Sequence, residues 1–133
     1  MAYEGPQINL PALTASADLS AKQYYFVKIS GANTVTVCAA ATDVPVGVLQ
    51  NTPTSGQAAV VCVYGVTKVS SDAALTAGNI IGTSADGQAD AKAWGTDKTE
   101  YGVGRMLTTT GAAGGIGTAI IDCALPTLLV TSA

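Results

Sequence analysis

The sequence contains no histidine and has few charged or aromatic side chains. Without an imidazole, neither a Ser-His-Asp nor a Cys-His arrangement can take the proton from a nucleophile. The commonest zinc ligand is missing as well. Neither Gly-Lys-Ser nor Gly-Lys-Thr occurs, so the chain has no P-loop for nucleotide phosphates. These absences argue against an enzyme, and we predict no catalytic, cofactor-binding or metal-ligating residue.

Charge is scarce and dispersed. Charged residues make up 11% of the chain, the net charge is −3, and the six Lys and Arg stand singly. Nucleic-acid binding needs clustered cations, and attachment to a membrane surface needs a polybasic patch. We therefore expect neither partner. Ordinary soluble domains carry roughly 25% charged residues, so the deficit favours a surface that is covered in the working state, as in a homo-oligomer or a docked subunit.

Long apolar runs are also absent. No run approaches the roughly 18 residues of a membrane span, and residues 1–6 have neither the basic nor the apolar region of a signal peptide. The three cysteines, Cys38, Cys62 and Cys123, each lie in an apolar stretch. Their odd number and wide spacing predict buried thiols rather than disulfides, which fits synthesis in a reducing cytoplasm.

What is present is a series of short β-branched, alternating segments separated by turn residues. About eight or nine such segments, at spacings of roughly 8–12 residues, are typical of an all-β fold, a small antiparallel β-barrel or sandwich. Residues 70–78 predict at most one short helix, which Ser71 or Asp72 would cap and Gly78 would end. The predicted strands are 24–29, 34–38, 44–49, 58–64, 66–69, 79–83, 88–91, 101–107 and 118–124.

The two ends differ from the middle, which spans residues 17–125 and carries the predicted barrel or sandwich. Residues 1–16 contain Pro6 and Pro11, which exclude a helix interior and favour extended backbone. We expect an extended N-terminal arm; a disordered tail is the alternative. Residues 126–133 form a C-terminal tail with a short apolar run, which we expect to pack on a neighbour or back onto the core.

Few segments invite a chemical interpretation. The glycine-rich residues 111–117 lack the following helix that a dinucleotide-binding loop requires, so a flexible hairpin loop is predicted. Asp122 lies in an otherwise apolar strand, where it either points outward or pairs across an interface with a lysine or with Arg105. Tyr24 and Tyr25 belong to the one aromatic cluster, which suits either the core or an interface.

Several glycine- and valine-containing segments follow one another in a fixed order: 24–29 with the turn at Asn33, 44–49, 63–69, 75–78, 87–89, 101–107 and 118–124. This order resembles that of the small tailed-phage head proteins called capsid cement or decoration proteins, the DUF2190-like group. The similarity covers roughly residues 15–125, and Arg105-Met106 stands where small residues are usual. The resemblance implies a β-rich subunit, often a trimer, that bridges major capsid protein subunits.

From this resemblance we expect a structural protein on the outer surface of a phage capsid, made in the bacterial host cytoplasm. The expected partners are the major capsid protein and further copies of the chain, in a homotrimer. A head fibre base, a tail protein, or an adhesin for host surfaces or carbohydrate is the alternative. The N-terminal arm is expected to bind the capsid through Tyr3, Glu4, Ile8 and Leu10. The expected subunit interface contains Tyr24, Tyr25, Arg105, Asp122, Leu128 and Leu129.

Overall fold

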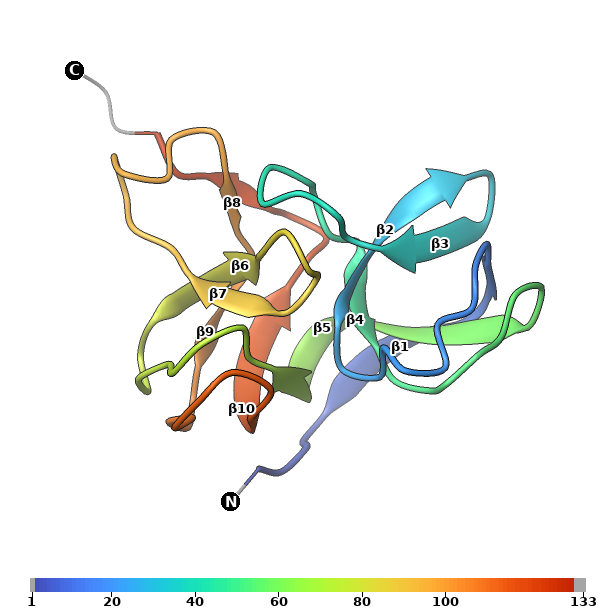
Figure 1. Ribbon diagram of the computed structural model, residues 1–133, viewed down its shortest axis with the longest axis horizontal. Helices are drawn as coiled ribbons and strands as arrows, with labels where there is room; N and C mark the ends of the chain where they lie inside the picture. The colour runs from blue at the N-terminus through green and yellow to red at the C-terminus, as the bar shows by residue number, and fades with distance from the viewer. Residues whose placement is uncertain (1, 131–133) are drawn as a thin grey trace.

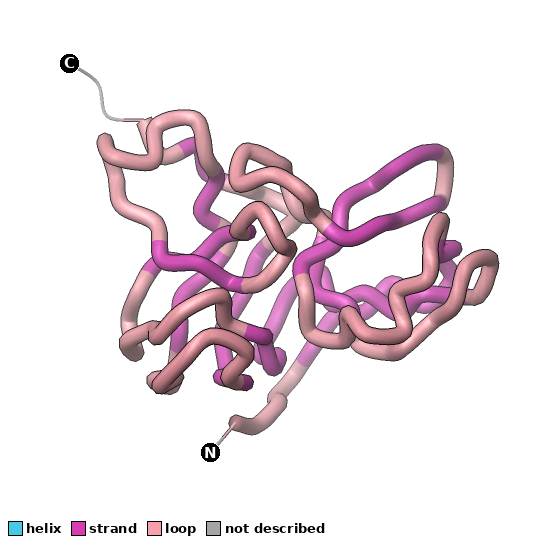
Figure 2. The backbone as a smooth tube through the Cα atoms, viewed as in Figure 1, coloured by secondary structure: helices cyan, strands magenta, loops and turns pink. Residues whose placement is uncertain are grey.

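The computed structural model describes residues 2–130. Within them it contains eleven strands and no helix, which confirms the predicted all-β class (Figures 1 and 2). The strands are β1 (Gln7–Ala15), β2 (Phe26–Gly31), β3 (Thr34–Val37), β4 (Gly47–Leu49), β5 (Ala58–Ser70), β6 (Ile80–Thr83), β7 (Ala89–Ala91), β8 (Tyr101–Gly102), β9 (Gly104–Met106), β10 (Ile116–Asp122) and β11 (Thr127–Leu128).

The N-terminal half closes into a small barrel. Five strands follow one another in the order β1-β3-β2-β4-β5, and β1 then pairs with β5 to complete the ring. The pairing of β1 with β3 is parallel and the other pairings are antiparallel. Alternate valines and leucines point inward, as the two-residue period of a strand requires. The interior is filled by residues such as Val27, Val35, Leu49 and Val61, none of which is exposed.

The C-terminal half forms a second ring around its own core. The sheet continues in the order β5-β10-β9-β6-β7. Ser71, directly after β5, forms a parallel bridge with Ala89 in β7. The amide of Asp72 donates to the Ala89 carbonyl at 2.8 Å, and the Gln88 side chain donates to the Ser71 carbonyl at 3.2 Å. The short β8–β11 pair lies outside this ring.

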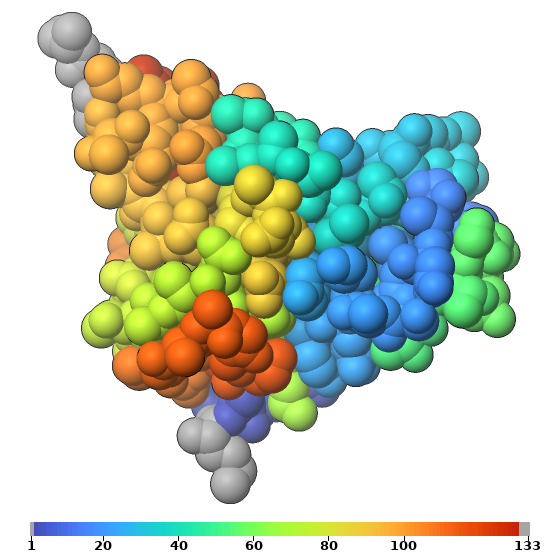
Figure 3. Space-filling view, viewed as in Figure 1, coloured from blue at the N-terminus to red at the C-terminus, as the bar shows by residue number. Residues whose placement is uncertain are grey.

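The two rings share β5 and lie side by side as two lobes (Figure 1). The turn between β6 and β7, yellow in Figure 3, sits at their junction. There Phe26 donates its amide to the Gly87 carbonyl at 2.7 Å. Gly87 has a φ of +82°, and a Cβ on it would lie 2.5 Å from Val37. A side chain at this position would therefore strain the turn and separate the lobes.

The helical turn predicted for residues 70–78 is wrong. Ser71 pairs with β7, as described, and Leu75 forms an antiparallel bridge with Thr110. The Leu75 amide donates to the Thr110 hydroxyl at 3.0 Å, and the Thr110 amide donates back to the Leu75 carbonyl at 2.9 Å. Backbone hydrogen bonds to a distant segment thus replace the local bonds of a helix.

The residues expected as an N-terminal arm are extended, and they run along β5 of the same chain. Ile8 lies opposite Tyr64, and Leu10 lies opposite Val61. Pro11 falls where the register shifts between Leu10 and Leu13, a place where a missing amide is tolerated. Of the C-terminal tail, Thr127–Leu128 pairs with β8. Met1 and residues 131–133 lie outside the described residues.

Candidate interaction surface

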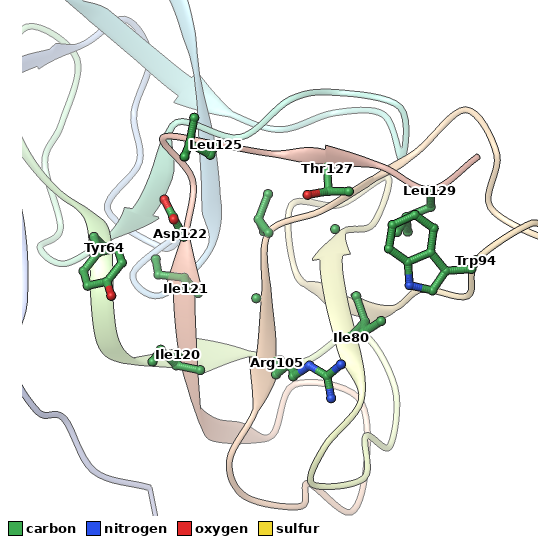
Figure 4. Close-up of a pocket in the computed structure, with 13 residues that line it drawn as sticks. Tyr64, Ile80, Trp94, Arg105, Ile120, Ile121, Asp122, Leu125, Thr127 and Leu129 are labelled. Carbon is green, nitrogen blue, oxygen red and sulfur yellow. The ribbon is translucent and has the colours of Figure 1, made fainter. Parts of the chain in front are cut away.

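An open groove of about 460 Å³ lies on the outer face of the second ring, which the C-terminal half forms (Figure 4). Strand register explains its floor. Tyr64 of β5 lies opposite Asp122 of β10, and Ile120 lies opposite Arg105 of β9. Arg105 in turn lies opposite Ile80 of β6. Since alternate residues of a strand point to the same face, Ile120 and Asp122 both face outward while Ile121 is buried.

The rim of the groove is apolar and exposed. Trp94 is 50% exposed and Leu125 is 76% exposed, the largest value among the large hydrophobic side chains. Leu129 also lines the groove, although it is fully buried in the chain itself. Exposed apolar area that is contiguous, rather than scattered, marks an interaction surface.

The loop that carries Trp94 is held by a buried ammonium group. The Lys92 side chain is fully buried and forms ion pairs with Glu100 and with Asp90, the latter at 3.7 Å. The Gly95 amide donates to the Leu129 carbonyl at 3.0 Å, which fixes the loop against the C-terminal segment. Trp94 is thus presented on an anchored loop.

Two charged side chains of opposite sign line the same groove. Within residues 2–130, the Arg105 guanidinium and the Asp122 carboxylate form no ion pair and no hydrogen bond with a side chain or backbone group. Arg105 is exposed and Asp122 is half-buried. The groove therefore offers one cation and one anion to a partner.

The four residues expected to bind a capsid lie at an exposed edge. Tyr3 and Glu4 are exposed, as are Ile8 and Leu10. The main chain of Tyr3 is held by the fully buried Thr118: its amide donates to Thr118 Oγ1 at 2.7 Å, and its carbonyl accepts from that hydroxyl at 2.8 Å. Because Ile8 lies opposite Tyr64, this edge is continuous with the groove. Capsid binding by these residues stays a prediction.

The residues expected at a subunit interface divide into two groups. Arg105, Asp122 and Leu129 line the groove, and Leu128, 40% exposed, is the last residue of β11 and directly precedes Leu129. The two tyrosines lie elsewhere. Tyr24 is partly buried against the core with the Lys68 ammonium 5.8 Å from its ring centre, and Tyr25 has the Lys22 ammonium 4.9 Å from its own.

Sequence reasoning did not identify several residues of the groove, namely Tyr64, Ile80, Trp94, Ile120 and Leu125. Two of them carried a signal. Trp94 is the only tryptophan and lies in a polar segment, and Leu125 precedes Pro126, where a strand must stop. The remaining three lie within apolar strands. In such strands an apolar residue that faces the core cannot be distinguished by sequence from one on an outer face that a partner covers.

The cysteines behave as buried thiols, as predicted. Burial raises the pKa of Cys38 to about 12 and that of Cys62 to about 11, and it also raises the pKa of Cys123. Residues 2–130 contain no group of three or more His, Cys, Asp or Glu side chains placed to hold a metal ion. In the same residues no helix is long and apolar enough to cross a membrane.

No family model matches this chain, and no curated protein matches it either. Among solved structures, the fold is similar to the crystal structure of the head fiber gp8.5 N base in bacteriophage phi29. The TM-score is 0.64 and the sequence identity is 18%, over 89% of this chain and 96% of that chain. The two chains therefore share the fold over nearly their whole lengths. Membership of the capsid cement group stays a prediction.

Proposed function

We propose that this chain is a structural protein of a tailed-phage virion that docks as a homotrimer on the outer surface of the head. There it bridges neighbouring major capsid protein subunits, after synthesis in the host cytoplasm. The observation that carries the proposal is the fold shared, over nearly the whole chain, with a phage head fibre base. We propose no catalytic role for the chain: it has no histidine, and its three thiols are buried.

The surface fits a docking role. The N-terminal edge presents Ile8, 62% exposed, and Tyr3, 50% exposed, beside an apolar groove. Single contacts of this size bind weakly. Three copies engaged at once gain avidity, since each further contact is made at a high effective concentration. A trimer over a seam between capsid subunits would raise the cost of separating them.

Co-sedimentation with heads tests this proposal. The protein is mixed with expanded, DNA-free heads and with unexpanded proheads of the phage that encodes it. We expect saturable binding to expanded heads, and a higher temperature at which those heads break open. Absence of binding to either particle would refute the proposal.

Matched variants locate the contact. Ile8→Ser removes an exposed isoleucine of the N-terminal edge, and Ile29→Ser removes one, 52% exposed, from β2 of the first barrel. We expect Ile8→Ser to weaken head binding by about tenfold, the effect of losing roughly 1.4 kcal/mol of apolar contact, and Ile29→Ser to leave it unchanged. Equal effects of the two substitutions would contradict a docking role for this edge.

The second candidate function is the base of a head fibre, which the fold comparison itself favours. A fibre base also binds the head, but its role is to anchor a projecting part. Binding to expanded heads without any gain in their thermal stability would support the fibre base over the bridging role.

A further inference from the structure

We propose that copies of this chain associate through the groove, with Arg105 of each copy paired with Asp122 of the next. Leu125 of each copy then lies in the groove of its neighbour. This inference rests on the proposed function, for which it names the contact surface between subunits. The occupant of the groove is therefore a second copy of the chain, and the capsid is contacted elsewhere.

The charges give the first reason. Arg105 and Asp122 line one groove, and neither has a side-chain partner within the described residues. Two large side chains lie next to these charges: Ile120 is 41% exposed and Tyr64 is 48% exposed. Covering this apolar surface would leave two desolvated charges unpaired, which is costly. A partner that brings one anion and one cation at matching places pairs both charges, and the same groove on another copy does so.

The shape of the surface gives the second reason. Leu125 projects from the rim, with 76% of its surface exposed, while Tyr64 and Trp94 line opposite sides of the groove (Figure 4). An exposed leucine and a hollow of about 460 Å³ occur together on one face. Each copy thus carries both a projecting side chain and a place that can receive one. Complementary features of this kind are what repeated subunits use to close a ring.

Symmetry makes the pairing complete. In a ring whose axis passes close to this face, Arg105 of each copy meets Asp122 of the next, so every charge is paired once. A trimer contains three such ion pairs and no leftover charge at the interface. Tyr24 and Tyr25, which lie away from the groove, take no part in it.

Charge exchange tests the pairing. Arg105→Asp and Asp122→Arg are each expected to place like charges together and to weaken trimer formation by at least about 30-fold, as for closely paired interfacial charges. The double variant Arg105→Asp/Asp122→Arg restores opposite charges and should recover the trimer to within about threefold. Analytical ultracentrifugation over a range of concentrations measures all three. Lys98→Glu, an exposed charge reversal in a loop, should have no effect.

A second variant and a second readout complete the test. Leu125→Ser changes a side chain that is mostly exposed in the single chain, so it leaves the fold intact and should weaken the trimer by about tenfold. Unchanged trimer mass in the single charge variants, or failure of the double variant to recover, overturns the inference. If the charge variants remain trimeric and lose head binding instead, the groove contacts the head: the inference fails while the proposed function stands.

Discussion

Replacing Gly65 by alanine tests how the N-terminal strand is fixed against β5. Gly65 has a φ of +126°, a conformation that L residues rarely adopt. A Cβ at this position would lie 2.2 Å from the Pro6 carbonyl oxygen and 2.8 Å from Gln7 Cα. Both neighbours are backbone atoms, so neither can move aside as a flexible side chain would. The alanine must therefore strain its own backbone and also displace residues 6 and 7.

Gly56→Ala is the matched control. Gly56 also has a positive φ, +85°, but nothing lies within 4 Å of the Cβ position. Its replacement therefore measures backbone strain alone, about 1 kcal/mol after the smaller entropy of the unfolded alanine chain is included. Gly65→Ala adds a clash comparable to overpacking, about 2 kcal/mol, to strain of about 1–2 kcal/mol. We expect a total near 3–4 kcal/mol.

Urea denaturation followed by circular dichroism measures both variants. In thermal melts the difference between them corresponds to roughly 3–6 °C per kcal/mol for a chain of this size. Hydrogen exchange gives a local readout, because the Val66 amide donates to the displaced Pro6 carbonyl at 3.0 Å. This amide should lose protection in Gly65→Ala only. If the two variants are destabilised equally, the close approach at Gly65 does not control the fold and the reasoning is refuted.

Three further predictions concern separate parts of the molecule. Thr118→Val removes both hydrogen bonds to the main chain of Tyr3; we expect faster proteolysis near Tyr3 and a loss of about 1–2 kcal/mol, and an unchanged cleavage rate would contradict this. Lys92→Met leaves its two carboxylate partners unpaired; a loss of about 2 kcal/mol and a red shift of Trp94 fluorescence are expected, and an unshifted spectrum would argue against the anchoring role. Burial raises the pKa of Cys38 from 9.0 to about 12. The thiol of the unfolded chain therefore ionises at lower pH than that of the folded chain. The free energy of unfolding should fall as the pH rises above about 9, and it should fall less steeply in Cys38→Ala than in the unsubstituted protein. Identical pH profiles of the two proteins would refute this prediction.

Sequence patterns correctly predicted those strands whose own residues favour extended backbone. Val35 and Val37 alternate with threonine, and Val61 stands in a β-branched run, so both segments form strands in any β fold. The segment around Leu75 could not be predicted in this way. Its hydrogen-bond partner Thr110 lies 35 residues away, and local propensity favoured a helix. A long-range pairing overrides such a weak local preference.

The candidate surface was predicted only in part for the same reason. Asp122 was noticeable because a carboxylate interrupts an apolar strand. Arg105 was noticeable because the resemblance to the capsid cement group led us to expect a small residue there. Their presence in one groove depends on the register of β10 against β9, which pairs Ile120 with Arg105. Register follows from the whole sheet rather than from either strand. The closure of each ring, through β1 and through Ser71, is likewise a property of the assembled chain.

Because β5 belongs to both rings, its neighbouring strands in either half lack a hydrogen-bonding partner without it. Melting one half withdraws this strand and leaves the other with an open seam, so the two halves should lose their structure together in a single step. A particle coat assembled from such units would contain no weak half that gives way early when pressure or heat rises.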